Sequence, residues 1–309
     1  MIRNKKIQRN FIIGDSWLYY KIYTGPKTAD AILTKIIKPV TEQLIKDNII
    51  DKWFFIRYAD PKHHVRVRLH YSKPKNVAVI IKCLYTYLKE FVDHDLIWKI
   101  QIDTYQREME RYGANTIELV EEFFYHDSKM IVDFIDMIEG NEGEELRWLF
   151  AMRAIDSQLN SYHYTDEAKL GLLDQLKTGF GNEFGMSRPL KKQLDNKYRE
   201  ERKKIEEFMI FNAEDMPDYT AILDAIKKKE EGILDAVSRT LKHKEEGSLQ
   251  MELNDLMGSC LHMLMNRLFK SKNRLHELVC YDFLYRYYRS MIAKKVKRTK
   301  LKTEAPLLR

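Results

Sequence analysis

The sequence predicts an α+β protein: an amino-terminal ferredoxin-like βαββαβ unit followed by a mostly α-helical carboxyl-terminal half packed against the sheet. Over the first hundred residues or so, short aromatic and β-branched runs alternate with helical spacing. Beyond Gly113 the spacing is helical almost throughout. The chain has only 12 glycines and 7 prolines, which favours long helices.

The elements predicted before Gly113 follow the order strand, helix, strand, strand, helix, strand. Their ranges are Trp17–Tyr23, Thr28–Lys46, Trp53–Tyr58, His64–Tyr71, Asn76–Val92 and Ile97–Tyr105. Pro39 predicts a kink in the first helix. The residues from Ala59 to Lys62 predict a hairpin turn between the second and third strands.

The carboxyl-terminal half is predicted to be all-α. The predicted helices are Thr116–Glu139, Glu144–Ser161, Lys191–Phe211, Tyr219–Lys242, Leu249–Lys270 and Arg274–Ala293. The stretch Thr178–Arg188 contains three glycines and predicts a mobile loop. We therefore expect a sheet region at residues 1–113, a helical region at 114–293, and a solvated, disordered basic tail at 294–309.

Composition excludes several classes of protein. With 44% hydrophobic and 32% charged residues the chain is typical of a globular protein, and no stretch approaches the roughly 20 apolar residues of a membrane span, so we expect it in the cytoplasm. Cys83, Cys260 and Cys280 lack zinc-ligand spacing and are predicted to be core thiols. The adjacent His63 and His64 form no HExxH motif, so we expect neither a metal nor a cofactor.

The predicted strand His64–Tyr71 carries arginines in an unusual place. Side chains alternate across a strand, so Arg66, Arg68 and His70 share one face and the apolar residues share the other. This strand is central in a ferredoxin-like sheet, and helices cover one face, so the arginines are predicted on the open face. Paired arginines there suit a carboxylate ligand.

Neighbouring strands are predicted to extend this face with aromatic and charged side chains. The predicted members are Trp17, Tyr19, Lys21, Tyr23, Phe55, Arg57, Gln101, Asp103 and Tyr105. The result would be a cationic platform with aromatic walls. An ordinary solvent-facing sheet surface is the alternative.

A charged turn follows the fourth strand and ends at Gly113. In it, Glu108 and Arg111 are three residues apart and can pair on one side of a helical turn. A surface salt bridge is the alternative interpretation.

The predicted helix Leu249–Lys270 is apolar except for one polar stripe. The stripe consists of Asp255, Ser259, His262 and Asn266. An imidazole in such a stripe can position a general base, although a lone histidine in a helix is more often structural.

Several segments, taken in order, resemble the C-terminal elimination domain of lantibiotic dehydratases, which also occurs as free-standing thiopeptide-type bacteriocin biosynthesis proteins. The segments are residues 12–25, 53–61, 64–69, 105–113, 261–268 and 281–286. The resemblance covers nearly the whole chain and implies one compact eliminase unit. The most specific motifs are YQREMERYG at 105–113 and LHMLMNRL at 261–268.

The resemblance implies a lyase that removes glutamate from glutamylated Ser or Thr of a precursor peptide. It implies a separate protein that transfers the glutamate from glutamyl-tRNA, because the glutamylation region is missing from this sequence. Transfer RNA would then act only through that partner, and DNA is not expected. A homodimer is the default oligomeric state.

The resemblance also carries functional residues onto matching positions. The catalytic set is Arg66, Arg68, Glu108, Arg111 and His262. His262 would accept the α-proton, and the arginines would stabilise the developing oxyanion or the leaving carboxylate. Glu108 would orient Arg111 or relay a proton. The predicted substrate-binding residues are Tyr19, Lys21, Arg57, Tyr105 and Asn266.

Three alternatives remain open. Thiopeptide pyridine synthases resemble the same domain but join two dehydroalanines in a formal cycloaddition. A non-catalytic scaffold could hold a leader peptide by strand addition at a sheet edge. RNA binding would use the basic tail and the aromatic sheet face, although the usual RNA-binding glycine and aromatic pattern is absent.

Overall fold

The computed structural model describes residues 7–138 and 140–304, and it combines helices with small antiparallel sheets, as predicted for an α+β protein. The chain divides into two compact units. The sheet unit comprises the residues up to Gly143 together with Asp224–Ser271. The helical unit comprises Glu144–Leu223 and the residues from Lys272 onward. The predicted sheet and helical regions, which meet between residues 113 and 114, do not coincide with these two units, because several later helices pack with the sheet.

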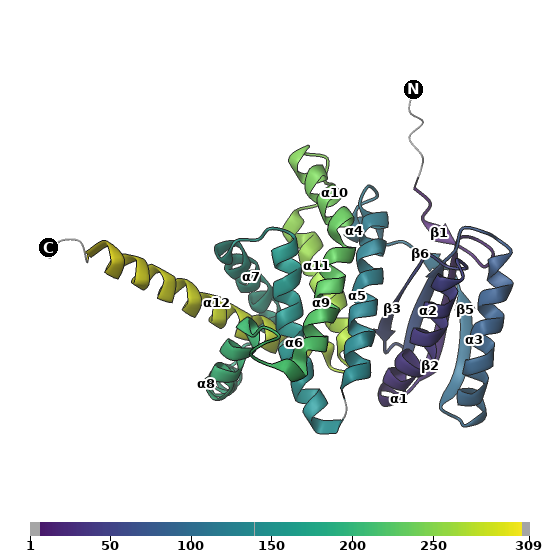
Figure 1. Ribbon diagram of the computed structural model, residues 1–309, viewed down its shortest axis with the longest axis horizontal. Helices are drawn as coiled ribbons and strands as arrows, with labels where there is room; N and C mark the ends of the chain where they lie inside the picture. Colours follow the sequence, from purple (N-terminus) through teal and green to yellow (C-terminus); the bar gives the residue numbers. More distant parts are fainter. Residues whose placement is uncertain (1–6, 139, 305–309) are drawn as a thin grey trace. The chain divides into compact units, whose positions relative to one another are not determined.

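All strands of the described chain belong to the sheet unit (Figure 1). They are β1 (Asn10–Phe11), β2 (Trp17–Thr24), β3 (Lys52–Tyr58), β4 (His64–His70), β5 (Ile97–Asp103) and β6 (Tyr105–Gln106). The main sheet has the order β3-β4-β2-β5 with every neighbouring pair antiparallel, and β1 pairs with β6 in a second small sheet. The predicted fourth strand is thus divided, because Tyr105 pairs with Phe11 of β1 rather than with β2.

The helices of the sheet unit surround this sheet. They are α1 (Pro26–Ile32), η1 (Leu33–Ile37), α2 (Lys38–Lys46), α3 (Asn76–Asp93), α4 (Met109–Tyr112), α5 (Ile117–Met137), α10 (Leu234–Glu245) and α11 (Leu253–Leu268). Two helices cross the boundary between the units, namely α6 (Gly140–Ser161) and α9 (Thr220–Gly232). The helical unit contains α7 (Asp166–Glu183), α8 (Arg188–Ile210), the 3₁₀ turn η2 (Pro217–Tyr219) and α12 (Asn273–Glu304).

A short π-helical segment, η1, lies just before Pro39, where the sequence predicts a kink. In η1 the N–H of Lys38 donates to the carbonyl of Leu33, one residue further back than in an α-helix. Pro39 has no N–H to donate, so the helix can widen just before it without losing a bond at that position.

The predicted loop Thr178–Arg188 is wrong for most of its length. Helix α7 continues to Glu183, and only the residues from Phe184 to Ser187 lie outside a helix. Here α7 packs along α12, and that packing outweighs the roughly 1 kcal/mol that each glycine costs in a helix.

The single helix predicted over Tyr219–Lys242 is two helices that meet at Gly232. A side chain at Gly232 would place its Cβ 2.1 Å from the His126 ring of α5. The glycine therefore permits the close approach of α9 to α5, and α10 begins two residues later at Leu234.

The predicted disordered tail is wrong for residues 294–304, which continue α12. Lys294 pairs with Glu206 at 3.0 Å, and Lys295 pairs with Asp166. The remaining tail residues, 305–309, lie outside the described residues.

The prediction of core thiols is confirmed for two of the three cysteines. Cys260 and Cys280 are buried, whereas Cys83 is half-buried. Burial raises the pKa of Cys260 to about 12, so its thiol stays protonated at neutral pH.

No helix within residues 7–138 and 140–304 has the length and apolar character needed to cross a membrane.

The main core of the sheet unit lies between the sheet and the helices α1 to α3. Leu18, Ile22, Val65 and Val67 are fully buried, and all four point to this face. Helix α5 runs along the outer side of β3, the edge strand at that end of the sheet. One sheet face is therefore apolar and covered, as the alternation in β4 predicts.

Side chains from α5 and α11 satisfy the free backbone groups of the edge strand β3. The Asn266 side chain accepts from the N–H of Arg57 at 2.9 Å and donates to its carbonyl at 2.9 Å. Arg267 Nε donates to the carbonyl of Phe55 at 2.8 Å, and the N–H of Phe55 donates to Ser128 Oγ at 3.3 Å. These bonds protect the edge from pairing with another chain.

A buried ion network holds the helices that perform this capping. Asp127 of α5 accepts from Arg267 Nη1 at 2.9 Å and from Lys229 Nζ of α9 at 2.6 Å. All three side chains are essentially inaccessible to solvent. Asp127 is the carboxylate that binds both cations. Its loss would therefore leave more uncompensated charge than the loss of either cation.

We expect Asp127→Asn to lower the free energy of unfolding by about 3–5 kcal/mol, because it removes the buried carboxylate that both Arg267 and Lys229 bind. Urea denaturation followed by circular dichroism measures this. The matched control is Asp235→Asn, which alters an exposed pair with Arg239 and should change stability by less than about 0.5 kcal/mol. Equal effects of the two substitutions would contradict the assigned importance of the network.

Candidate active site

The register of the sheet places the two arginines of β4 beside polar residues of β2. Arg66 lies opposite Lys21, and Arg68 lies opposite Tyr19. Gln101 and Asp103 of β5 continue the same face, because they pair with Lys21 and Tyr19. The predicted grouping of these side chains on the face away from α1 to α3 is confirmed.

Arg68 occupies a box of aromatic rings on this face. Its guanidinium carbon lies 4.5 Å from the ring centre of Tyr19, 4.8 Å from that of Tyr105 and 5.1 Å from that of Phe54. The side chain is only 8% exposed, yet its Nε and Nη1 have no hydrogen-bond partner within the described part of the chain. Buried donors without partners are rare and costly. The arrangement therefore suits an anionic ligand that supplies the missing acceptors.

Arg66 lies next to Arg68 on the face but has protein partners. Its Nε donates to Nε2 of His64 at 2.9 Å, and its guanidinium lies 3.5 Å from the ring centre of Tyr58. His64 Nδ1 is 2.8 Å from the carbonyl of Lys62, which fits a neutral ring that donates from Nδ1 and accepts at Nε2. Burial lowers the pKa of His64, and the charge of Arg66 adds to that effect, so the neutral form is favoured.

His64 is a residue of this site that the sequence reasoning did not identify. The sequence predicts it as the first residue of a strand and assigns it no role, and in the structure it begins β4 and pairs with Tyr23 of β2. The alternation that groups Arg66 with Arg68 also includes position 64, so the signal was present in the sequence.

Lys21 is held by a carboxylate on the neighbouring strand. Its ammonium group donates to Asp103 Oδ2, and this bond lowers the pKa of Asp103. The charge of Lys21 on this face is therefore offset by the charge of Asp103. Tyr19 differs, because burial raises its pKa while the charges of Arg68 and Arg66 partly oppose that rise.

Tyr105 is fixed by a buried carboxylate of α5. Its hydroxyl donates to Glu121 at 2.8 Å, and Arg107 binds both oxygens of Glu121 at 2.7 and 2.6 Å. Tyr105 therefore offers Arg68 its ring, while its hydroxyl is engaged elsewhere. The network orients one wall of the aromatic box.

The predicted positions of Phe55 and Arg57 on this face are wrong. In the hairpin Tyr58 pairs with His64, so Phe54 lies opposite Arg68, and Phe55 and Arg57 point to the helix-covered face. The length of the turn sets this register, and a shift of one residue moves every side chain of a strand to the other face. Arg57 is instead structural, because it donates to Asp30 at 2.5 Å and to the carbonyl of Arg267 at 2.8 Å.

The remaining predicted residues lie on two elements that pack beside β3. Glu108 and Arg111 form an exposed pair at 3.3 Å at the start of α4, as their spacing predicts. His262 and Asn266 lie one turn apart on α11, and both are half-buried. Helix α11 packs against α4, α5 and β3.

Phe124 of α5 links these elements to the arginine face. Its ring centre lies 5.6 Å from that of Phe54 in the box around Arg68, and 5.5 Å from that of Tyr112 at the end of α4. The guanidinium of Arg267 on α11 lies 4.2 Å from the same ring. One aromatic side chain therefore contacts the arginine box, the helix that follows Glu108 and the helix that carries His262.

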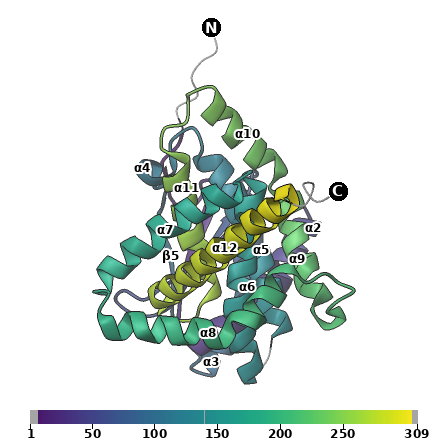
Figure 2. The ribbon, with the colours of Figure 1, turned by 90° about the vertical axis from the view of Figure 1, so that its left-hand side faces the viewer.

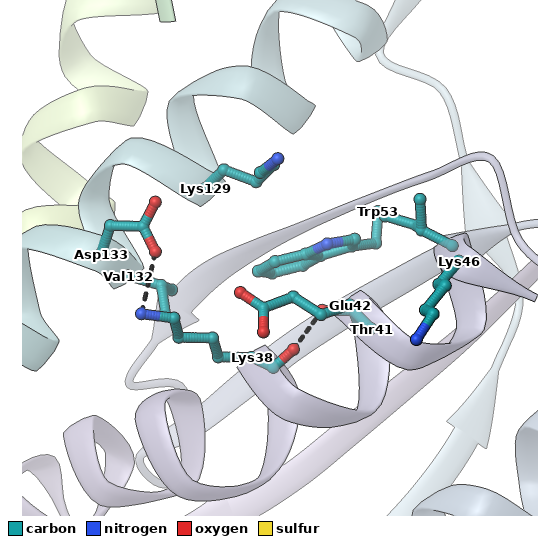
Figure 3. A pocket seen from close by; sticks show the side chains of 9 residues that line it. Lys38, Thr41, Glu42, Lys46, Trp53, Lys129, Val132 and Asp133 are labelled. Carbon is teal, nitrogen blue, oxygen red and sulfur yellow. Dashed lines mark hydrogen bonds and ion pairs between the residues drawn. The ribbon is translucent and has the colours of Figure 1, made fainter. Parts of the chain in front are cut away.

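A separate pocket lies between α2 and α5, on the helix-covered side of the sheet (Figure 3). It has a volume of about 240 Å³, and the Trp53 ring lies between the side chains of Lys129 and Glu42. None of the predicted site residues lines it. No group of three or more His, Cys, Asp or Glu side chains in the described ranges could hold a metal ion.

Residues 17–288 match the family described as "Lantibiotic biosynthesis dehydratase C-term". The chain belongs to this family. The match includes every residue predicted for the active site, so the arginine box and the polar face of α11 both lie inside the family domain.

Two curated members of the family illustrate the relation. The subtilin biosynthesis protein SpaB of Bacillus subtilis is 26% identical over 287 residues, which is 88% of this chain and 26% of SpaB. The nisin biosynthesis protein NisB of Lactococcus lactis subsp. lactis is 29% identical over 147 residues, 46% of this chain and 14% of NisB. The chain thus spans about a quarter or less of the length of these relatives.

Solved structures show the same fold. The tRNA-dependent lantibiotic dehydratase MibB from Microbispora sp. 107891 superposes with a TM-score of 0.69 and 19% identity, over 88% of this chain and 28% of MibB. TbtD, a pyridine synthase from thiomuracin biosynthesis, superposes with a TM-score of 0.60 and 13% identity, over 89% of this chain and 99% of TbtD. TsrL superposes with a TM-score of 0.61 and 14% identity, over 89% of this chain and 94% of TsrL.

Two arginine substitutions separate binding from structure. We expect Arg68→Met to keep the free energy of unfolding within about 1 kcal/mol or to raise it, because it removes buried donors that have no partner in the described chain. Arg107→Met should cost about 3–5 kcal/mol, because it leaves Glu121 buried and unpaired. Urea denaturation of both variants tests this. An Arg68 variant as unstable as the Arg107 variant would mean that Arg68 is structural.

Proposed function

We propose that this chain is a lyase that eliminates glutamate from glutamylated Ser or Thr in a ribosomally made precursor peptide. The products are dehydroalanine or dehydrobutyrine and free glutamate. The observation that carries the proposal is the buried guanidinium of Arg68, which has aromatic walls and two nitrogens without partners in the described residues. A leaving carboxylate or a developing oxyanion would supply the missing acceptors.

The family architecture supports the assignment. The element order of the sheet unit and the strand order β3-β4-β2-β5 fit a ferredoxin-like split unit. The curated relatives carry the names of subtilin and nisin biosynthesis proteins, and MibB is described as a tRNA-dependent lantibiotic dehydratase. These names favour the dehydration of a precursor peptide as the general function. Glutamate elimination is the step of that process that we assign to this domain.

The proposed reaction balances without a cofactor. We assign His262 as the base that accepts the α-proton of the modified residue. The electron pair of the broken C–H bond forms the new double bond, and the bond between the β-carbon and the ester oxygen breaks. Glutamate leaves as a carboxylate, and His262 later releases its proton to solvent.

The cationic residues have complementary proposed roles. Arg66 and Arg68 stabilise negative charge on the substrate carbonyl and on the leaving group, since both lie on one face of β4. Arg111 adds a third positive charge, and Glu108 orients it through their ion pair. Tyr19, Lys21 and Tyr105 shape the binding surface.

We further propose that a second protein provides the glutamylated substrate. The chain covers 28% of MibB and 26% of SpaB, so most of each dehydratase lies outside the matched region. A glutamyl-tRNA-dependent partner would supply the ester, and the cytoplasm, where charged tRNA is found, is the place proposed for both steps.

A pyridine synthase is the second candidate. TbtD is described as such an enzyme, and the match covers 99% of its length, so a chain of similar size carries that activity on this fold. The higher identity to SpaB and NisB, at 26% and 29% against 13% to TbtD, favours elimination.

The decisive experiment gives the protein a peptide already glutamylated on Ser or Thr, without tRNA or ATP. We expect mass spectrometry to show loss of glutamate and formation of an alkene. His262→Ala should lower the rate by about 10²–10⁴-fold, as expected for loss of a general base. The matched control, His94→Ala, alters an exposed histidine at the end of α3 and should keep full activity.

Two results would overturn this assignment. An unchanged glutamylated peptide, together with cyclisation of a peptide that contains two dehydroalanines, would establish the pyridine synthase. Full elimination by the His262 variant would remove that residue from the base role.

A further inference from the structure

Two adjoining cavities lie in the helical unit, between α8 and α12. Their volumes are about 400 and 510 Å³, and both are lined by Asp195, Arg286 and Arg289. Helix α12 packs against both α7 and α8, which Figure 2 shows face-on. The shared lining residues make one continuous groove, which we call the α8–α12 groove.

The α8–α12 groove is strongly cationic. Its charged lining residues are Lys177, Lys191, Arg199, Arg202, Arg286, Arg289, Asp195 and Asp282. Both carboxylates bind the same arginine, since Arg286 contacts Asp195 at 2.7 Å and Asp282 at 2.6 Å. The acids are therefore satisfied internally, and the surplus of positive charge is available to a ligand.

Three of these cations are not held in a direct ion pair among the described residues, although the charges of Lys191 and Arg199 help to lower the pKa of the nearby Asp195 carboxyl. Arg202 pairs with Glu206 at 3.0 Å, whereas Lys191, Arg199 and Arg289 form no ion pair within 4.0 Å there. All three are exposed at the groove. Uncompensated charges that converge on one concave surface concentrate anionic ligands.

A buried hydroxyl group at the groove also lacks a partner. Tyr198 lines the larger cavity and is only 8% exposed, and its hydroxyl has no hydrogen-bond partner in the described chain. Burial raises the pKa of Tyr198, so the hydroxyl remains a donor at neutral pH. This unsatisfied donor distinguishes the groove from a merely basic surface.

The lining also selects among anions. Met186, Leu194 and Ala293 add apolar surface, the carboxylate of Asp195 lines both cavities, and that of Asp282 lines the smaller one. A nucleic acid strand would bring its phosphates close to these carboxylates. A peptide can place acidic side chains at the free cations, apolar side chains at the apolar positions and its N–H groups near the carboxylates.

We propose that the α8–α12 groove binds an acidic peptide segment in which Asp or Glu residues recur about every four positions among apolar residues. Lys191 and Arg199 are eight positions apart on α8, a separation of about 12 Å that roughly four extended residues span. The preferred ligand therefore carries acids about four residues apart. None of the candidate active-site residues lies in the groove, so this binding is independent of the elimination chemistry.

The test uses the full-length protein and a short fluorescein-labelled peptide in which glutamates recur every fourth residue between leucines. Fluorescence anisotropy should show binding that weakens with salt. The double variant Arg199→Ala and Arg289→Ala should lose affinity by about fivefold or more, because each exposed cation contributes modestly. Tyr198→Phe should lose roughly tenfold while keeping its melting temperature, because the hydroxyl has no described protein partner.

Two matched controls define the site. Lys203→Ala removes a charge from the same helix at a side chain that is 90% exposed and does not line the groove, and it should bind like the wild type. A peptide with glutamine in place of glutamate should not bind.

Three outcomes would overturn the proposal. The first is no binding of the acidic peptide by the wild-type protein. The second is equal loss of affinity in the Lys203 and Arg199 variants, or none in Tyr198→Phe, either of which would indicate general surface electrostatics. The third is tighter binding of a single-stranded RNA of equal charge that displaces the peptide, which would indicate a nucleic acid site.

Discussion

The buried guanidinium of Arg267 is the interaction on which the sheet unit depends. It donates to the carbonyl of Phe55 on the edge strand β3, binds Asp127 on α5, and lies over the ring of Phe124. Burial lowers the pKa of Arg267 and Asp127 opposes that shift, so the carboxylate offsets part of the cost of burying the charge. Without this contact the carbonyl of Phe55 would lose its partner on the edge of β3, and α11, which carries His262, would be held to that strand by Asn266 and Arg57 alone.

The same strand serves the core and the candidate site because its two faces meet different surroundings. On one face of β4, Val65 and Val67 are sealed beneath helices. On the other, Arg68 is enclosed by rings that remove water but supply no acceptor. Removing water from a cation strengthens its attraction to an anion, so the aromatic box prepares Arg68 for a charged substrate. The Tyr105–Glu121–Arg107 network keeps one wall of the box in place.

The sequence could predict the alternation within each strand but not the pairing between strands. The arginine face of β2 and β4 followed from side-chain parity, and the polar spacing correctly grouped His262 with Asn266. The sheet face on which Phe55 and Arg57 lie depends on the length of the hairpin turn, and the alternation of side chains along a strand does not determine that length. Arg267 was passed over because it lies off the polar stripe, and its role arises only from the free carbonyl of a distant strand. Similarly, the glycines of α7 predicted a loop because its packing against α12 is not a local property.

Arg57 and Arg68 show how structure separates two buried arginines that look alike in sequence. Both lie on neighbouring strands of one sheet, and both are 8% exposed. Arg57 binds the carboxylate of Asp30 and the carbonyl of Arg267, so it joins β3 to α1 and α11. Arg68 is surrounded by aromatic rings and forms no ion pair with a carboxylate among the described residues. The first arrangement stabilises the protein, whereas the second leaves buried donors without acceptors and costs stability. Such a cost is expected where a ligand supplies the missing acceptors. The contrast therefore makes Arg68, rather than Arg57, the better candidate for binding an anion.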